Sequence, residues 1–211
     1  MKPPLVSVVT PTIPSRHELL LNRCIPSVQA QTYRNVEHVI VSDCPDPELE
    51  AALKRWVHGS IFTHPVLYTQ LPGPHPGHRY GGAARRKGIE MAQGGLIAYI
   101  DDDDALRPEH VSKLAAALND DPALMWAFSV MASHSNTGLY THIGDYAGPP
   151  QACMIGTPML MHRREILRYG TWGEPSQTED WELVKKWLDA GLPYGRVHEP
   201  TVDVYPSAYW G

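Results

Sequence analysis

The feature that most constrains the fold of this chain is a regular alternation of strand-like and helix-like segments in its first half. Short runs of β-branched and aliphatic residues alternate with stretches in which apolar residues recur at helical spacing. The expected strands cover residues 5–9, 36–41, 66–71 and 96–100, and the expected helices cover residues 16–31, 47–57, 83–92 and a stretch from residue 108. This alternation predicts an α/β fold with a mostly parallel central sheet. Pro26, inside the first helix, predicts a kink there.

The second half of the chain shows a different pattern. Strands are expected at residues 125–131 and 139–143, around the turn Asn136-Thr137-Gly138, and at residues 159–162. An amphipathic helix is expected at residues 178–190, and an extended segment at residues 196–205. We therefore expect a small antiparallel part beside the parallel sheet. The 211 residues contain no repeat and no interdomain linker, which favours a single domain over residues 1–211.

The composition argues against several classes of protein. Hydrophobic residues make up 43% of the chain and charged residues only 19%, which is enough apolar material for a core and argues against disorder. The formal net charge of −5 argues against nucleic acid as the main partner. Three widely spaced cysteines favour neither a disulfide framework nor a zinc site. The cysteine pattern fits a reducing cytoplasm, where we expect the protein to lie. No apolar run approaches the ~20 residues of a membrane span, so we expect at most peripheral membrane contact.

Polar side chains follow three of the expected strands, at the point where each strand ends. Thr10, Pro11 and Thr12 follow the first strand, Asp43 follows the second, and four consecutive aspartates, residues 101–104, follow the fourth. The carboxyl ends of parallel strands meet at one edge of the sheet, where open α/β sheets bind their ligands. We therefore expect these groups to converge in one site.

The four aspartates favour a divalent cation. Adjacent carboxylates repel one another, and a cation relieves that repulsion. Oxygen-only ligands favour Mg²⁺ or Mn²⁺ over zinc. Alternate residues that leave a strand point the same way, so Asp101 and Asp103 could share the cation while Asp102 has another task. The alternative is a solvated acidic turn before the helix that follows Pro108.

Five further residues are candidates for binding or catalysis, each with a structural alternative. Asp43 could accept a hydrogen bond from a base or a ribose, or could simply form a turn. Arg79 and Arg85, in and after a loop rich in Gly and Pro, could bind a diphosphate in bidentate fashion or lie on the surface. Glu179 and Asp180 begin the late helix, where a carboxylate could deprotonate a hydroxyl or interact with the helix dipole.

Together these pieces resemble glycosyltransferase family 2, the inverting enzymes with the GT-A fold. The resemblance covers most of the chain from residue 5 to about residue 188. It rests on four segments in order: SVVTPTIPSRHELLLNRCIPSVQAQTY, NVEHVIVSD, GGAARRKGIEMAQGGLIAYIDDDDALRPEHV and TEDWELVKKWL. The resemblance implies that about residues 1–107 bind a nucleotide-sugar and about residues 108–211 bind the acceptor.

The resemblance also implies roles for individual residues. The donor is expected to be a nucleotide-diphosphate sugar, with a UDP-sugar favoured, and the cation to be Mn²⁺ or Mg²⁺. The donor would contact Thr10, Pro11, Thr12, Arg16, Asp43, Arg79, Arg85 and Asp102, the metal would be held by Asp101 and Asp103, and catalysis would use Asp180 as general base beside Glu179. Asp103 matches the direct metal ligand of the family, and Asp102 would face the ribose.

Some positions depart from the family pattern, and some choices stay open. Asp43 is followed by Cys44-Pro45 rather than Gly-Ser, and the late Tyr-Arg-x-His segment is absent. His198 could add a metal ligand, although a lone histidine is more often structural. Trp172, with two aromatic residues near the end of the chain, Tyr209 and Trp210, could stack on acceptor sugars, although aromatic residues more often belong to the core. The acceptor could be a glycan, a lipid-linked intermediate, a small molecule, a protein or a modified nucleobase.

Two other functions compete with a transferase. A catalytically degenerate relative would bind a nucleotide-sugar or a glycan without turning it over, and would show a broken metal motif or base. A sugar-phosphate nucleotidyltransferase would need a glycine-rich loop after the first strand to hold a triphosphate. Residues 10–16 contain no glycine, which argues against the second function.

Overall fold

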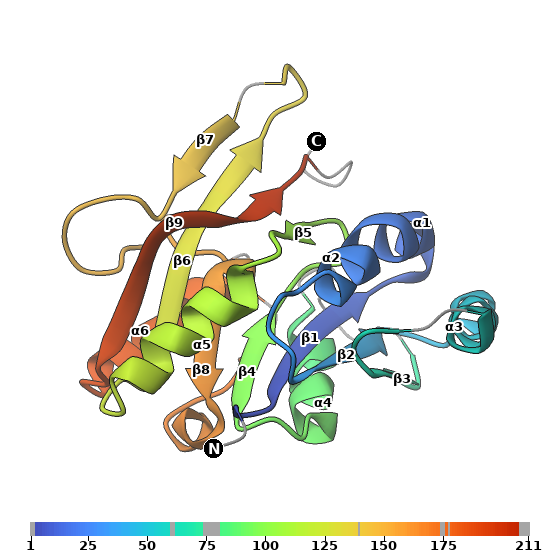
Figure 1. Ribbon diagram of the computed structural model, residues 1–211, viewed down its shortest axis with the longest axis horizontal. Helices are drawn as coiled ribbons and strands as arrows, with labels where there is room; N and C mark the ends of the chain where they lie inside the picture. Colours follow the sequence, from blue (N-terminus) through green and yellow to red (C-terminus); the bar gives the residue numbers. More distant parts are fainter. Residues whose placement is uncertain are drawn as a thin grey trace.

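One sheet of nine strands, with helices on both of its faces, forms the centre of the described structure (Figure 1). The structure is a computed structural model and describes residues 3–59, 62–73, 81–138, 140–173, 176 and 178–206. The strand order is β3-β2-β1-β4-β8-β6-β9-β5, and β7 pairs with β6 beside this path. The strands are β1 (Val6–Thr12), β2 (Val36–Ser42), β3 (Val66–Gln70), β4 (Leu96–Tyr99), β5 (Ala105–Leu106), β6 (Trp126–His134), β7 (Tyr140–Ile143), β8 (Leu160–Arg163) and β9 (Tyr194–Val204).

The first four strands are parallel to one another, as the sequence predicts. β1 lies between β2 and β4, and β3 flanks β2. Every residue of β1 and β2 is buried, because helices cover both faces of this part of the sheet. The other strands join through antiparallel pairs, except that β6 and β9 are parallel. The α/β fold class is confirmed, with its antiparallel pairs concentrated in the second half of the chain.

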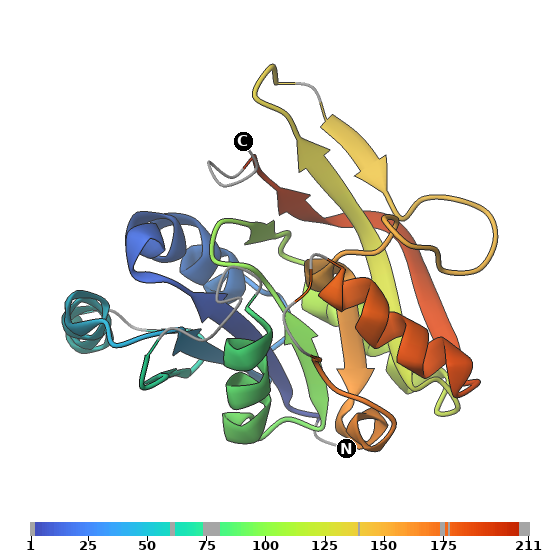
Figure 2. The ribbon, with the colours of Figure 1, turned by 180° about the vertical axis from the view of Figure 1, so that it is seen from behind.

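The helices form two layers. α4 and α6 cover one face of the sheet (Figure 2), and α2 and α5 cover the other (Figure 1). The helices are α1 (His17–Leu19), α2 (Ile25–Gln29), α3 (Pro47–Gly59), α4 (Gly82–Met91), α5 (His110–Asp120) and α6 (Glu179–Asp189), with 3-10 turns η1 (Pro14–Arg16), η4 (Thr157–Met159) and η5 (Arg164–Arg168). Within the described ranges, no helix combines the length and the apolarity needed to cross a lipid bilayer.

The first helical segment is irregular just before Pro26, where the sequence predicts a kink. Its residues run as α1, then a π-helix, η2 (Leu20–Cys24), and then α2. Proline has no N–H to donate, and its ring displaces the carbonyl four residues earlier. An inserted π turn is one of the recognised ways in which a helix absorbs such a break.

Two apolar cores fill the space between the sheet and its helix layers. The core beneath α4 and α6 is rich in aromatic rings. Trp126 lies at its centre, with its ring 5.8 Å from that of Phe128 and 5.6 Å from that of Trp187. Because Trp187 belongs to α6, this aromatic cluster fixes α6 against the sheet.

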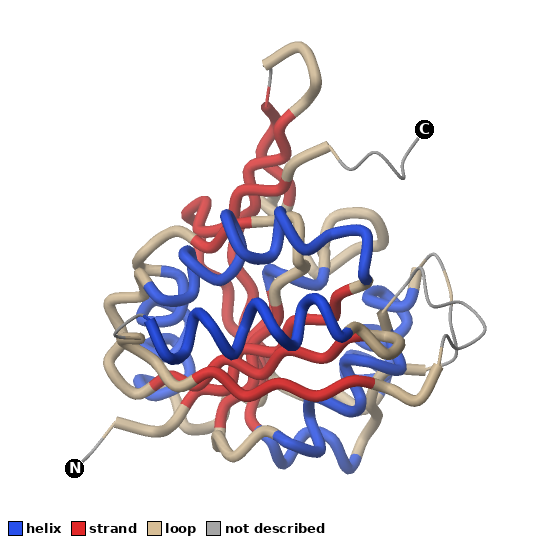
Figure 3. The backbone as a smooth tube through the Cα atoms, turned by 90° about the vertical axis from the view of Figure 1, so that its right-hand side faces the viewer, coloured by secondary structure: helices blue, strands red, loops and turns tan. Residues whose placement is uncertain are grey.

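The hairpin formed by β6 and β7 projects from the body of the molecule (Figure 3). The loop that follows it is held from β9 by Arg196, whose Nη2 donates to the carbonyl of Gly148 at 2.7 Å. The guanidinium carbon of Arg196 also lies 4.6 Å from the centre of the ring of Tyr146, which belongs to this loop. The loop is therefore tied to the sheet by a cation–π contact and by backbone hydrogen bonds.

α4 approaches β1 so closely that one helical position has room only for glycine. A Cβ atom built on Gly88 would lie 2.4 Å from Cγ1 of Val9, which is fully buried. We expect Gly88→Ala to lower the free energy of unfolding by at least about 1 kcal/mol, because overpacking outweighs the better helix propensity of alanine. Urea unfolding measures this loss. Gly95→Ala is the control, since a Cβ built on Gly95 would meet no described atom within 4 Å, and an equal loss there would contradict the steric explanation.

Candidate active site

A cavity of about 660 Å³ lies at the carboxyl ends of β1, β2 and β4. The second half of the chain closes it from the opposite side, through residues such as Met131, Pro158 and Val204. Most of the residues that the sequence marks as functional line this cavity: Pro11, Thr12, Arg16, Asp43, Arg85, Asp101, Asp102, Asp103, Glu179 and Asp180. The structure therefore brings the three strand ends together with the start of α6.

Two of the described residues predicted to bind ligands, Thr10 and His198, are not part of the cavity wall. Thr10 is fully buried, and its hydroxyl lies 2.8 Å from Nε2 of His38, so its side chain faces the core and the predicted nucleoside contact is not supported. The side chain of His198 is 66% exposed and is not part of the cavity wall. Arg79 lies outside the described residues.

The aromatic residues predicted to stack on an acceptor are placed differently. Trp172 is only 2% exposed and packs edge-on against Tyr99, with the ring centres 5.1 Å apart. The prediction that Trp172 stacks on a sugar is therefore wrong, because its ring belongs to the core. Tyr209 and Trp210 lie outside the described residues.

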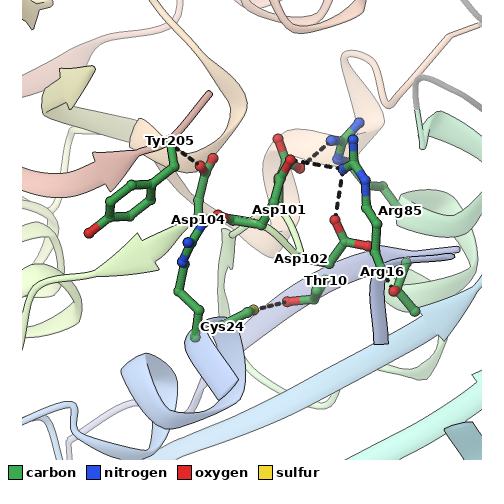
Figure 4. A network of polar contacts seen from close by, with 11 residues as sticks. Thr10, Arg16, Cys24, Arg85, Asp101, Asp102, Asp104 and Tyr205 are labelled. Carbon is green, nitrogen blue, oxygen red and sulfur yellow. Dashed lines mark hydrogen bonds and ion pairs between the residues drawn. The ribbon is translucent and has the colours of Figure 1, made fainter. Parts of the chain in front are cut away.

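The acidic loop, which we define as residues 101–104, is held by arginines (Figure 4). Nη2 of Arg85 donates to Oδ1 of Asp101 at 2.6 Å. Asp102 accepts from Nη1 of Arg16 at 2.9 Å and from the hydroxyl of Thr12 at 2.8 Å. The charges of Asp101 and Asp102, which are neighbours in the sequence, are thus neutralised by two different arginines.

The second half of the acidic loop has different partners. Oδ2 of Asp103 lies 3.1 Å from Nη1 of Arg16, and the backbone carbonyl of Asp103 accepts from Arg23. Oδ1 of Asp104 accepts from the backbone N–H of Tyr205 at 3.0 Å. Asp104 therefore ties the acidic loop to the end of β9.

Burial sets the proton affinity of two of these aspartates. It raises the pKa of Asp102 to about 6, although the neighbouring guanidinium of Arg16 acts in the opposite direction. Burial also raises the pKa of Asp104 well above its usual range, and the charges of Asp101 and Asp103 add to the effect. A cation placed beside the loop would favour the ionised forms of both groups.

The acidic loop offers the oxygen donors that a hard divalent cation prefers. Among the loop residues in salt bridges, Asp101 and Asp103 are more exposed than Asp102: their side chains are 30% and 10% exposed, against 3% for Asp102. Within the part of the chain that the structure describes, no three His, Cys, Asp or Glu side chains are arranged to hold an ion. The protein would therefore supply one or two carboxylates, and phosphate oxygens and water would complete the coordination, which is the usual arrangement for Mg²⁺. The donor set fits a cation that binds together with a diphosphate.

Glu179 and Asp180 stand at the first turn of α6, on the cavity wall. Oε1 of Glu179 accepts from Nη1 of Arg85, whereas Oε2 is buried without a hydrogen-bond partner among the described residues. Burial raises the pKa of Glu179 to about 7, against the opposing charge of Arg85. Burial also raises the pKa of Asp180, against a hydrogen bond from the N–H of Trp181 at 2.7 Å. Both carboxyl groups are therefore better proton acceptors than ordinary surface carboxylates.

Sequence reasoning missed the aromatic stack beside the acidic loop. The ring of Tyr205 lies between the guanidinium of Arg23, 4.1 Å from its centre, and the imidazole of His134, 4.7 Å away and nearly parallel. Both faces of this cavity-lining ring are therefore in contact with other side chains. No local spacing predicts this stack, because its members come from the first helical segment, β6 and the end of β9.

Comparison with known proteins gives a family and a fold. A model of the family "Glycosyl transferase family 2" matches residues 7–184. The protein named "Putative glycosyltransferase EpsH", from Bacillus subtilis (strain 168), is 29% identical to this chain over 126 residues. That match covers 59% of this chain and 33% of EpsH, so the chain spans about a third of the length of this relative.

Two solved structures resemble the whole described fold. TarS 1-349 of S. aureus in complex with UDP-GlcNAc has a TM-score of 0.72 at 16% identity, over 96% of this chain and 59% of that chain. The mannosyltransferase PcManGT from Pyrobaculum calidifontis, in complex with GDP-Man and Mn²⁺, has a TM-score of 0.71 at 15% identity, over 96% and 56% of the two chains. At these identities the likeness shows the fold alone, and it confirms the expected GT-A-like architecture.

Proposed function

The chain belongs to glycosyl transferase family 2, and we propose that it moves a sugar from a nucleotide-diphosphate sugar to an acceptor hydroxyl with inversion at the anomeric carbon. The observation that carries this proposal is the meeting of the acidic loop, Asp43 and the Glu179-Asp180 pair around one cavity. These groups come from the ends of three different elements, and a glycosyl transfer needs a site for each of its parts. One part holds the nucleoside, one the diphosphate, and one the proton that the acceptor loses.

The donor would lie along the ends of β1 and β2. Asp43 is only 2% exposed and lies on the cavity wall. Its carboxylate would accept a hydrogen bond from the base or the ribose of the donor. Pro11 and Thr12 form the wall beside it. TarS and PcManGT, which share this fold, were solved in complex with UDP-GlcNAc and GDP-Man, and we favour a UDP-sugar as the donor of this chain.

Asp101 and Asp103 would hold Mn²⁺ or Mg²⁺ against the diphosphate of the donor. The cation would supply positive charge where the departing diphosphate gathers negative charge. Arg16 adds a fixed positive charge on the same side of the cavity, because its guanidinium already bridges Asp102 and Asp103. The contribution of the chain to the departure of the diphosphate is that it fixes the positions of the carboxylates of Asp101 and Asp103.

Asp180 would accept the proton of the acceptor hydroxyl. Its neighbour Glu179 is engaged by Arg85 and only 6% exposed, which makes it the poorer candidate for contact with an acceptor. The acceptor oxygen would attack the anomeric carbon on the face opposite the diphosphate, while its proton passes to the carboxylate of Asp180. One displacement inverts the configuration and needs no covalent intermediate.

Binding of a nucleoside diphosphate in a metal-dependent way is the first test. We expect one of UDP, GDP, dTDP and CDP to raise the midpoint of thermal unfolding when Mn²⁺ or Mg²⁺ is present, and EDTA to remove the effect. Ligand at ~100 times its dissociation constant adds about 2.7 kcal/mol of stability, which a thermal-shift assay detects easily. Absence of binding by every diphosphate with both metals would sink the transferase proposal.

A further inference from the structure

Arg85 is a buried arginine that joins two parts of the cavity wall. It belongs to α4, and its side chain is only 5% exposed. Nη2 donates to Oδ1 of Asp101 at 2.6 Å, and Nη1 donates to Oε1 of Glu179. Asp101 belongs to the acidic loop and Glu179 opens α6, so one guanidinium connects the proposed metal site with the helix end that carries the proposed base.

The position of this guanidinium is fixed from several sides. Its central carbon lies 4.7 Å from the centre of the Trp172 ring, and Tyr99 packs edge-on against that ring. A buried charge needs charged partners, and the planar fork of arginine directs its N–H groups to two carboxylates in a fixed geometry that the flexible ammonium of lysine does not impose. Arg85 is therefore held as an internal bridge, whereas a residue that reaches out to a ligand would keep its donors towards the cavity.

We propose that Arg85 is a positioning residue that sets the spacing between the acidic loop and Asp180 and favours the ionised form of Asp180, rather than a ligand of the diphosphate. The reasoning is electrostatic as well as geometric. Asp180 is faced by the positive charge of Arg85 from α4 and by the negative charges of Asp101 and its own neighbour Glu179. Without Arg85, these two carboxylates would act on Asp180 without the positive charge that α4 supplies. This role rests on the proposed function, in which Asp180 is the base.

The test compares Arg85→Gln and Arg85→Lys with the control Arg86→Gln. Arg86 is the next residue of α4, and its Nη1 donates to the backbone carbonyls of Trp172 and Gly173. Calorimetry with UDP and Mn²⁺ measures donor-side binding. Carboxyl ¹³C NMR, assigned with Asp180→Asn, measures the pKa of Asp180 in the ligand-free chain.

For Arg85→Gln we expect UDP affinity within about threefold of the wild type and an Asp180 pKa raised by at least about half a unit. Arg85→Lys should restore part of the charge effect but not the two-carboxylate bridge, so turnover stays low. In Arg86→Gln the pKa of Asp180 should stay where it is. A tenfold loss of UDP affinity in Arg85→Gln with an unmoved Asp180 pKa would overturn the proposal and make Arg85 a diphosphate ligand.

Glu179→Gln keeps Arg85 and a hydrogen-bond acceptor, and it tests the electrostatic coupling around Asp180 if Arg85→Gln fails to fold, in which case Arg85→Lys carries the test of UDP affinity. Loss of the negative charge of Glu179 should lower the pKa of Asp180, and an unchanged value contradicts the electrostatic coupling. The two proposals fail separately. If the wild type binds no nucleotide, the transferase falls, while the NMR titrations still decide whether Arg85 and Asp180 are coupled.

Discussion

Asp180→Asn is expected to lower turnover at least about 100-fold, because asparagine cannot accept the proton that the acceptor hydroxyl loses. The substitution keeps the shape of the side chain at the first turn of α6 and its acceptor oxygen for the N–H of Trp181. Donor binding should therefore change little, and the loss should appear in kcat rather than KM. Turnover is followed as release of the nucleoside diphosphate from the donor.

The pH dependence of turnover gives the same prediction a second readout. Burial raises the pKa of Asp180, and a general base works only when ionised. Turnover should therefore fall as the pH drops through a value above the usual range of an aspartate, and this acidic limb should vanish in Asp180→Asn. Asp189→Asn, at the exposed far end of the same helix, is the control for a general effect of charge on α6. Near wild-type turnover in Asp180→Asn would exclude Asp180 as the base.

Asp103→Asn is expected to have the next largest effect, through the metal. The side chain keeps its size but loses the charge that would hold the cation, and a metal-ligand charge of this kind supports several kcal/mol of transition-state stabilisation, or at least about 100-fold in kcat/KM. Affinity for the nucleoside diphosphate in Mn²⁺ should fall towards the value measured in EDTA. Calorimetry with Mn²⁺ and with EDTA measures this directly.

Two comparison variants make the Asp103 result specific. Asp120→Asn removes an exposed aspartate at the end of α5 and should leave the metal dependence intact. Asp102→Asn should keep the metal-dependent affinity that Asp103→Asn loses, because the side chain of Asp102 is buried against Thr12 and Arg16. If Asp103→Asn keeps full metal-dependent affinity while Asp102→Asn loses it, the ligand assignment within the acidic loop is wrong.

The parts of the site that the sequence predicts are those that follow from strand topology. Asp43 and the acidic loop each follow a strand of the parallel sheet, and the carboxyl ends of such strands necessarily share an edge. Glu179 and Asp180 begin the helix that the hydrophobic spacing predicts. Their presence in one cavity agrees with the prediction, whereas their chemical roles stay proposals.

The parts that the sequence does not predict depend on which way a side chain turns after its element is placed. Thr10 shares a face of β1 with Val6 and Val8, and its side chain enters the core. Thr12 follows on the same face at the very end of the strand, and its side chain reaches the cavity. Arg85 looks like a surface arginine in the sequence because its two carboxylate partners come from distant segments. The burial of Trp172 is equally hard to predict from the sequence, because its neighbour Tyr99 comes from β4, far away in the chain.

The bond between Asp104 and Tyr205 has a consequence for the order in which this protein folds during synthesis. The two residues are 101 positions apart, and the Arg85–Glu179 pair is separated by 94. Contacts of such range form late, because the ends of a long segment must first be brought together. A ribosome delivers the strands up to β4 well before it delivers β9, so a nascent chain can assemble its parallel sheet while its acidic loop still lacks Tyr205 and Glu179. The parallel part of the sheet would therefore form first, and the cavity would reach its final geometry only after the C-terminal segments have been synthesised.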